Sequence, residues 1–364
     1  MKKQEISRCC LIPPFVLEQI SNHCDEYTNQ HVLKTLDHVY SLMKITDLEN
    51  ASQTEYETES DETIKPNRTI YDAEQKEEFP GGKLVRNEGM PDSDDIAVNE
   101  AYEYLGKTHE FYNKIFGRNS LDNRGLKLVA TVHYGKNYLN AFWSRKQMVF
   151  GDGDGQYFNR FTSAIDVIAH ELTHGVIQNE VNLYYAYQSG ALNESISDAF
   201  GIMVKQYANH QRADESDWLL GKEILGPHFN PENKSDIALR SFIKPGTAFS
   251  NDRQVAHMDQ YEELPITLDN GGVHIYSGIP NKAFYLLAIA LGGYSWERAG
   301  KIWYETLLDD DLSSYATFDE FATLTIKSAE RLFGKNIAHI TSQCWKEVGV
   351  LLPKNDSKNI NIIS

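Results

Sequence analysis

The chain has 364 residues, of which 41% are hydrophobic, and this is enough for two packed domains with a sizeable core. It carries 52 acidic and 35 basic residues, and its formal net charge of −17 argues against nucleic acid or an anionic membrane surface as the main partner. The longest apolar run, Phe284 to Leu291, is too short to cross a bilayer, so we expect no membrane span.

The first 20 residues contain no apolar signal core, because the charged residues Lys2, Lys3, Glu5 and Arg8 are followed only by a short apolar run. We therefore expect residence in the cytoplasm, or secretion by a non-classical route. Four cysteines in a chain of this length do not make a disulfide framework, and we expect reduced thiols.

Residues 1–50 are expected to form a small helical unit, because apolar residues recur at helical spacing in Pro14–Ile20 and again in His31–Met43. Residues 51–68 are polar and include Pro66, which is typical of an exposed linker.

The next stretch is rich in β-branched residues and predicts strands separated by one helix. The expected strands are 69–73, 83–86 and 126–134, the helix is 98–116, and a hairpin is expected from 140–143 and 147–150.

Residues 165–177 are apolar enough to form a buried helix, and this helix carries two histidines, His170 and His174. A spacing of four residues brings both imidazoles to one face of a helix, one turn apart. Two imidazoles in that arrangement can share one zinc ion, and Glu171 would lie beside the open coordination position.

Zinc hydrolases use three protein ligands and leave the fourth position to water. A third histidine six residues after the second is excluded, because Glu180 occupies that position. The next helix instead supplies Glu194, with Asp198 four residues later on the same face. We expect Glu194 to bind zinc and Asp198 to accept the spare ring N–H of a zinc-bound histidine. The alternative is that both acids are ordinary solvated helix residues.

Beyond Glu194 the apolar spacing is helical. The expected helices are 195–210, 281–291, 296–308, 318–333 and 340–348.

From about Thr69 to Leu352 the sequence resembles the thermolysin family of zinc metalloendopeptidases. Near the start, Pro13-Pro14-Phe15 resembles the protealysin-like subgroup, whose members carry a short precursor segment. The stretches that carry the family resemblance are Asn140–Trp143, Met148–Gly155, His170–His174, Gly190–Asp198 and Asp269–Gly278.

The resemblance implies an α+β fold with two lobes and a cleft between them. The β-rich lobe would comprise residues 69–180 including the zinc helix, the helical lobe residues 181–353, and a tail residues 354–364. Residues 1–50 would be an inhibitory propeptide that covers the cleft and is cut off within the linker 51–68; a permanent accessory domain is the alternative. A cysteine of this precursor segment, Cys9 or Cys10, is either a reduced thiol or a thiolate cap on the zinc.

For substrate binding, the resemblance makes Asn140–Trp143, with Ala141 and Phe142 between them, an exposed edge strand on which an extended peptide lies. The side chain of Asn140 would also hold the substrate amide. Further pocket residues implied by the resemblance are Phe158, Phe161, Val167 and Leu239, whose apolar character predicts cleavage on the amino side of bulky hydrophobic residues.

For catalysis, the resemblance makes Glu171 the group that takes the water's proton and delivers it to the leaving amine. His274 and Tyr185 would stabilise the oxyanion, and Asp269 would orient the ring of His274. Arg240 would hold a substrate carbonyl and brace the glutamate ligand. The glycines that precede His274 would let the backbone approach a bound ligand.

One departure concerns the double calcium site found in part of the family. Asp166 and Asp217 are present, but the matching positions otherwise carry Lys205, Leu219 and Lys222, which cannot coordinate a hard cation. We predict that this calcium site is absent and that a lysine pairs with Asp166 or Asp217.

The favoured hypothesis is therefore a zinc endopeptidase made as a self-inhibited precursor, with protein or peptide substrates and its own propeptide as inhibitor. The rival is a catalytically silent zinc-bearing binding protein of the same fold. An aminopeptidase would need an acidic anchor for a free N-terminus, and the sequence shows no motif for one.

Overall fold

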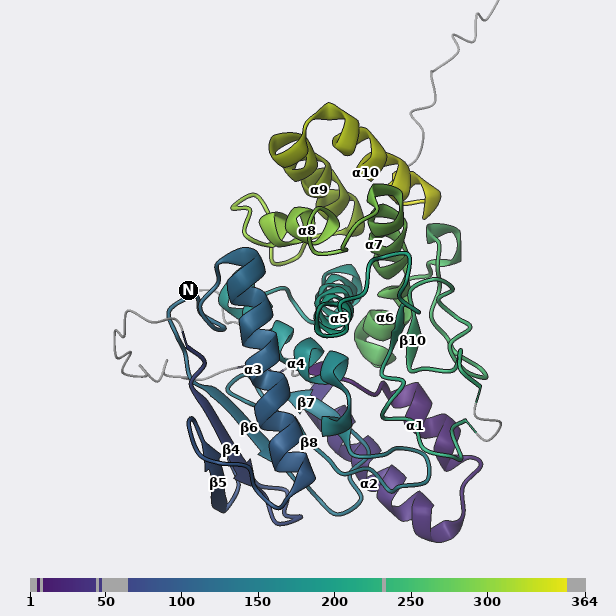
Figure 1. Ribbon diagram of the computed structural model, residues 1–364. Coiled ribbons are helices and arrows are strands. Elements are labelled where there is room, and N and C mark those ends of the chain that lie inside the picture. Colours follow the sequence, from purple (N-terminus) through teal and green to yellow (C-terminus); the bar gives the residue numbers. More distant parts are fainter. Residues whose placement is uncertain (1–4, 7–8, 44–45, 48–64, 231–233, 352–364) are drawn as a thin grey trace, which may run out of the picture.

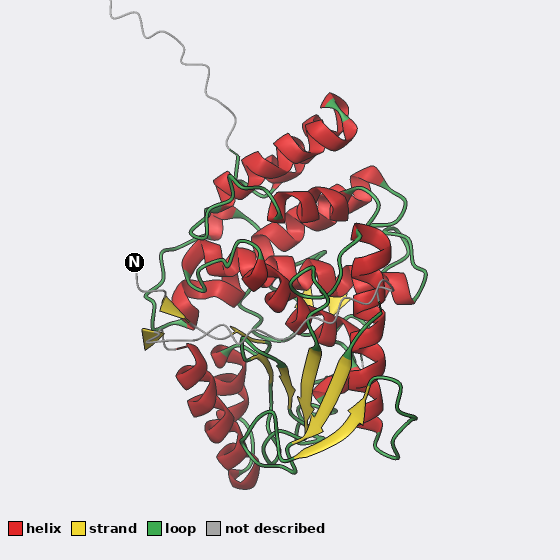
Figure 2. Cartoon of the chain, turned by 90° about the vertical axis from the view of Figure 1, so that its left-hand side faces the viewer, coloured by secondary structure: helices red, strands yellow, loops and turns green. Residues whose placement is uncertain are grey.

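The computed structural model describes residues 5–6, 9–43, 46–47, 65–230 and 234–351. A β-rich part and a helical part lie on either side of two central helices, as the sequence predicts (Figure 1). Figure 2 shows the molecule from the side, with the larger strands in the lower half and helices above and beside them. Most of the expected linker and the whole expected tail fall outside the described residues.

The main sheet has six strands in the order β2-β7-β8-β6-β4-β5. Strand β6 runs parallel to both of its neighbours, β4 and β8, while the other pairs are antiparallel. The strands are β2 (Cys9–Cys10), β4 (Arg68–Asp72), β5 (Lys83–Asn87), β6 (Leu128–Val132), β7 (Ala141–Trp143) and β8 (Met148–Phe150). Two short antiparallel pairs lie outside this sheet: β1 (Glu5–Ile6) with β3 (Thr46–Asp47), and β9 (Leu219–Leu220) with β10 (Arg240–Ser241).

Helix α3 (Ile96–Phe116) covers one face of the sheet (Figure 1). It begins two residues before the expected start because Asp95 caps it, accepting hydrogen bonds from two backbone N–H groups of the first turn. It ends at Gly117, whose left-handed conformation is the usual way to close a helix.

The two central helices are α4 (Ile165–Asn179) and α5 (Tyr187–Ala208). Every residue of α4 from Asp166 to Ile177 is buried, so the helix is enclosed on all sides. Helix α5 begins three residues before Gly190, where a Cβ atom would lie 2.4 Å from Cγ1 of Val273. Glycine at this position therefore permits close helix packing rather than a helix start.

The helical part is completed by α6 (Asp269–Tyr276), α7 (Gly278–Leu291), α8 (Ala299–Leu307), α9 (Phe318–Phe333) and α10 (Lys335–Glu347), with short 3₁₀ turns at Phe161–Ser163 and Met258–Gln260. Thr317 and Glu320 form a capping box that starts α9. Helix α10 begins five residues before the expected start, directly after Gly334. The stacked rings of Trp303 and Trp345, 5.7 Å apart, tie α8 to α10.

The N-terminal unit, defined here as residues 9–43, consists of β2, α1 (Pro14–Ser21) and α2 (Glu26–Met43). Its apolar side chains join the main hydrophobic core. Strand β2 pairs with β7, so the expected exposed edge strand Asn140–Trp143 is in fact covered, because the N-terminal unit supplies the next strand (Figure 1). Among the described helices, none is both long and apolar enough to span a membrane.

A histidine between two acids links the cap of α3 to the loop after β8. His133 lies with Nε2 2.8 Å from Asp95 and Nδ1 2.9 Å from Asp152. The hydrogen bond with Asp152, acting against burial, and the contact with Asp95 raise the pKa of His133 to about 9. The protonated ring therefore joins the two carboxylates across most of the physiological pH range.

Because this pKa is raised above its ordinary value, the stabilisation is fully present below about pH 6.5 and is lost as the pH rises through about 9. We predict that His133→Gln lowers the free energy of unfolding at pH 6 by about 1–2 kcal/mol. This is less than the whole pKa shift corresponds to, because both acids are partly exposed and solvent screens the interaction. Thermal unfolding at pH 6 and above pH 9 measures this, with the exposed His339→Gln as control. An equal difference at both pH values would contradict it.

Candidate metal centre

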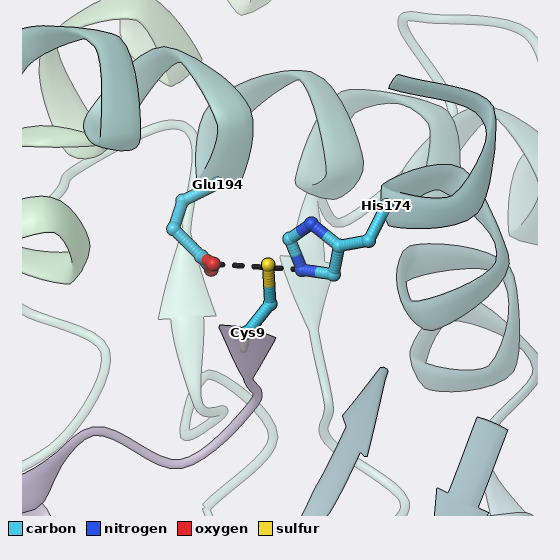
Figure 3. A group of neighbouring side chains, drawn as sticks. All are labelled: Cys9, His174 and Glu194. Carbon is cyan, nitrogen blue, oxygen red and sulfur yellow. Dashed lines mark ion pairs between the residues drawn. The ribbon is translucent and has the colours of Figure 1, made fainter. Parts of the chain in front are cut away.

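Helices α4 and α5 bring three candidate ligands together in the interior. Figure 3 shows His174 from α4 and Glu194 from α5 pointing toward one another, with Nε2 3.4 Å from Oε1. His170, one turn before His174, has Nε2 3.0 Å from that of His174 and 3.5 Å from Oε2 of Glu194. All three side chains are at most 2% exposed.

These donors fit a zinc ion. Ligands bound at about 2.0–2.2 Å in a tetrahedral arrangement lie roughly 3.3–3.6 Å apart, close to the sides of this triangle. Oε2 of Glu194 has no hydrogen-bond partner among the described residues. Burial lowers the pKa of His174 to about 3, so its ring is neutral, as a metal ligand must be.

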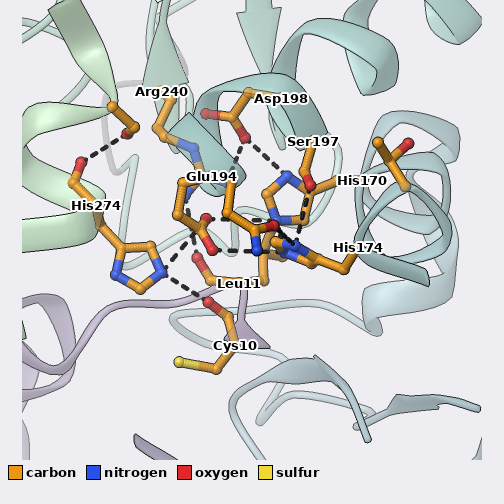
Figure 4. Close-up of polar contacts among 12 residues, drawn as sticks. Cys10, Leu11, His170, His174, Glu194, Ser197, Asp198, Arg240 and His274 are labelled. Carbon is orange, nitrogen blue, oxygen red and sulfur yellow. Dashed lines mark hydrogen bonds and ion pairs between the residues drawn. The ribbon is translucent and has the colours of Figure 1, made fainter. Parts of the chain in front are cut away.

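The outer nitrogens of both rings are held by α5. Nδ1 of His170 lies 2.8 Å from Oδ1 of Asp198, and Nδ1 of His174 lies 2.8 Å from Oδ1 of Asn193 and 3.0 Å from Oγ of Ser197 (Figure 4). Contacts of this kind direct each Nε2 lone pair toward the triangle. Sequence reasoning missed Asn193 and Ser197, although their four-residue spacing beside Glu194 is a helical signal.

Asp198 is itself held by two further groups. Nη2 of Arg240 donates to it at 2.8 Å, and Nδ2 of Asn281, which the sequence did not suggest, donates at 2.9 Å. Burial opposes ionisation of Asp198, but Arg240 and His170 together hold its pKa below the usual range. The structure thus pairs Arg240 with Asp198, whereas we expected it to brace Glu194; the guanidinium reaches the acid one turn further along α5.

Glu171 lies in the same interior with both carboxylate oxygens lacking hydrogen-bond partners among the described residues. Burial and the charge of Glu194 raise its pKa well above the ordinary value. A carboxyl group with a raised pKa beside a metal site is typical of a general acid–base catalyst.

His274 and Tyr185 reach the triangle from the opposite side. Nδ1 of His274 lies 2.6 Å from Asp269, while the hydroxyl of Tyr185 donates to Glu194 at 2.5 Å and lies 3.4 Å from Nε2 of His274. Burial opposes protonation of His274, but Asp269 and Glu194 raise its pKa to about 9. Its second nitrogen is then available as a hydrogen-bond donor.

The two glycines before His274 form a turn. Gly271 and Gly272 have φ values of +79° and +86°, a region that favours glycine. Cβ atoms there would meet the rings of Tyr187 and Tyr276 at 2.4–2.5 Å. The turn holds Asp269 and His274 together.

The start of the N-terminal unit lies in the expected substrate path. Leu11 donates from its backbone N–H to the Ala141 carbonyl at 3.0 Å, and Nη1 of Arg240 donates to the Leu11 carbonyl at 3.1 Å. Asn140 holds Ile12 through both ends of its side-chain amide, at 2.8 and 3.0 Å. Leu11 and Ile12 of the N-terminal unit therefore occupy the positions in which a substrate peptide was expected to bind.

Nε2 of His274 lies 2.8 Å from the carbonyl oxygen of Cys10, so Cys10 also lies in the expected substrate path (Figure 4). The remaining candidate pocket residues, Phe158, Phe161, Val167 and Leu239, are all buried in the main core.

Comparison with known families shows the class to which the chain belongs. Residues 24–178 match the thermolysin metallopeptidase catalytic domain, and residues 181–350 match the thermolysin metallopeptidase alpha-helical domain. The chain belongs to the thermolysin family of metallopeptidases. It is therefore an enzyme, and the metalloprotease class expected from the zinc-helix motif is confirmed.

Relatives within the thermolysin family match nearly the whole chain. Protease PrtS of Photorhabdus sp. (strain Az29) is 50% identical over 95% of this chain and 93% of its own length. An extracellular metalloprotease of Pectobacterium carotovorum subsp. carotovorum is 50% identical over 96% and 98%, respectively. The solved precursor of protealysin from Serratia proteamaculans is 47% identical, covers 94% of this chain and all of its own, and superposes with a TM-score of 0.82. The expected protealysin-like subgroup is thereby confirmed.

The expected destination is wrong. We expected cytoplasmic residence or non-classical export, but the Pectobacterium relative is named as an extracellular enzyme. The lack of an apolar core in residues 1–20 is a single missing feature, and it does not determine where a protein acts.

At the position of the family's double calcium site, a lysine reaches the buried acid. Nζ of Lys205 lies 3.3 Å from Oδ2 of Asp166 and donates to the Leu219 carbonyl at 2.9 Å. Lys222 lies 3.8 Å from Asp217 at the surface. The expected pairing of a lysine with Asp166 or Asp217 is therefore present, at both acids.

Proposed function

We propose that this thermolysin-family chain is a zinc-dependent endopeptidase, held latent by its N-terminal unit, that cleaves on the amino side of bulky hydrophobic residues. The observation that carries this proposal is the buried triangle of His170, His174 and Glu194, with the unpartnered Glu171 carboxylate nearby. Bound in this triangle, zinc supplies a Lewis acid for the scissile carbonyl and for a water molecule.

The remaining steps of the reaction are assigned to side chains of the protein. Glu171 accepts the proton of the attacking water and passes it to the leaving amine. His274 and Tyr185 donate hydrogen bonds to the carbonyl oxygen as it gains negative charge. Arg240 and Asn140 hold the peptide beyond the scissile bond, as they hold Leu11 and Ile12 here.

The N-terminal unit supports both latency and specificity. Its backbone lies as a substrate would, with Cys10 contributing the carbonyl nearest His274 and Leu11 following it. Leu11 is fully buried, which supports a preference for a bulky apolar residue at that place. We infer that residues 1–50 are an inhibitory propeptide released by a cut in 51–68, rather than a permanent accessory domain. The extracellular relative favours action outside the cell.

We predict that Glu171→Gln lowers casein hydrolysis by at least about 10²-fold, because the proton carrier is lost. The matched control, Glu347→Gln, changes an exposed acid far from the triangle and should leave activity unchanged. Chelation should abolish the activity of the unsubstituted enzyme, and added zinc should restore it. Equal activity in both variants would favour a catalytically silent protein or a different base.

We predict that N-terminal sequencing finds a new terminus within residues 51–68, and that casein hydrolysis appears with this cut. Cleavage of a peptide library should favour Leu or Phe over Gly after the scissile bond by at least about tenfold in kcat/KM, since each buried methylene adds binding energy. Full activity in the uncut chain would show that the N-terminal unit is an accessory domain.

We also propose that the family's double calcium site is absent, with Lys205 taking the place of the cation. Lys205→Met should lower the free energy of unfolding by about 3–5 kcal/mol, because Asp166 would be left buried without a countercharge. Lys222→Met, at the exposed pair, should cost only about 0–1 kcal/mol. Thermal unfolding measures both effects, and a marked rise of the unfolding midpoint in millimolar calcium would overturn the proposal.

A further inference from the structure

The third side chain in Figure 3 comes from the N-terminal unit. Ligand atoms of Cys9, His174 and Glu194 all lie within 4.8 Å of one another, and all three side chains are buried. The sulfur therefore lies close to two of the three members of the candidate zinc triangle. It also lines a cavity of about 70 Å³ whose walls include Trp143 and Tyr185.

The position of Cys9 is fixed by its backbone. Cys9 pairs with Trp143 in the antiparallel ladder, and the Cys10 and Leu11 carbonyls that follow are held by His274 and Arg240. Successive side chains of a strand point to opposite faces. Accordingly Cys10 turns its sulfur toward the Ile12 carbonyl, 3.8 Å away, and has no part in the cluster.

A second observation indicates that these residues bind a cation between them. Oε2 of Glu194 and both carboxylate oxygens of Glu171 are buried without hydrogen-bond partners among the described residues. Unpartnered buried carboxylate oxygens are costly unless a cation is bound nearby. Three protein ligands leave one zinc position open, and thiolate sulfur is among the ligands that zinc binds best.

We propose that the Cys9 thiolate is the fourth zinc ligand in the uncut chain, so that latency is chemical as well as steric. The inference rests on the proposed zinc-dependent function. As the sulfur binds, its S–H bond breaks, an S–Zn bond forms, the water molecule in the fourth position leaves, and the proton passes to solvent. No oxidation or reduction takes place.

This coordination explains how a segment that lies like a substrate can inhibit the enzyme without being cleaved. The Cys10–Leu11 peptide bond lies where a scissile bond would, with His274 on one carbonyl and Arg240 on the next. With sulfur in the fourth position, no water is held there to attack that bond. Release requires the N-terminal unit to leave, because β2 is hydrogen-bonded to β7.

X-ray absorption at the zinc edge tests the proposal on the full chain carrying Glu171→Gln, which prevents self-processing. We expect one sulfur at about 2.3 Å beside nitrogen and oxygen at about 2.0–2.1 Å. The sulfur signal should vanish in Cys9→Ser and persist in the matched Cys10→Ser. It should also vanish once added active enzyme has removed the N-terminal unit. Only nitrogen and oxygen around bound zinc would overturn this inference alone, whereas no bound zinc would overturn the proposed function as well.

Latency provides a second readout in chains that retain Glu171. Cys9→Ser should raise casein hydrolysis or self-processing of the fresh uncut chain by at least about tenfold, the scale of losing one group that tunes a metal site. Cys24→Ser, which changes another free cysteine of the N-terminal unit outside the ligand cluster, should remain as latent as the unsubstituted chain, and equal latency in all three would contradict the proposal. Should Cys9→Ser fail to fold, the sulfur signal of the Glu171→Gln chain before and after processing decides the question.

Discussion

The close packing of α4 against α5 is the constraint on which the site depends. It places two imidazole nitrogens and a carboxylate within 3.0–3.5 Å of one another in the interior, where all three side chains are at most 2% exposed. Such a cluster is costly to bury unless each polar atom has a partner or a cation binds between them. Asp198, Asn193 and Ser197 lie within 2.8–3.0 Å of the outer ring nitrogens, and the inward-facing atoms are left for a metal.

Asp198 connects the metal site to the rest of the structure. This one carboxylate accepts from Arg240 and Asn281 while it faces His170, so three separate elements are joined at a single buried charge. Arg240 in turn holds the Leu11 carbonyl. The metal site, the substrate path and the N-terminal unit are therefore connected by consecutive hydrogen bonds.

The N-terminal unit uses the sheet in the manner of a peptide ligand. An unpaired strand edge offers a row of backbone donors and acceptors to any extended chain, and β2 fills that row on β7. Main-chain bonds of this kind do not depend on side-chain identity. The side chains at Cys9 and Leu11 can therefore be specialised, since Cys9 lies beside the metal ligands and Leu11 is buried in the hydrophobic core.

Much of this protein could be read from its sequence, because the relevant information is local. Helical spacing alone brings His170 and His174 to one face, and it sets Glu194 and Asp198 one turn apart. In the main sheet, every strand except β2 was predicted to within a few residues, as were most helices. The starts of α5 and α10 were misplaced because their first turns lie outside the apolar pattern, and neither helix begins with a side-chain cap that would mark its start.

Tertiary structure decided what no local pattern could. The partner of Arg240, the pairing of β2 with β7, and the orientation of Cys9 rather than Cys10 toward the ligands all join residues more than 40 positions apart. Spacing in a sequence specifies which side chains share a face of one helix or strand. Which faces meet depends on how the elements pack, and that is fixed only when the whole core is assembled.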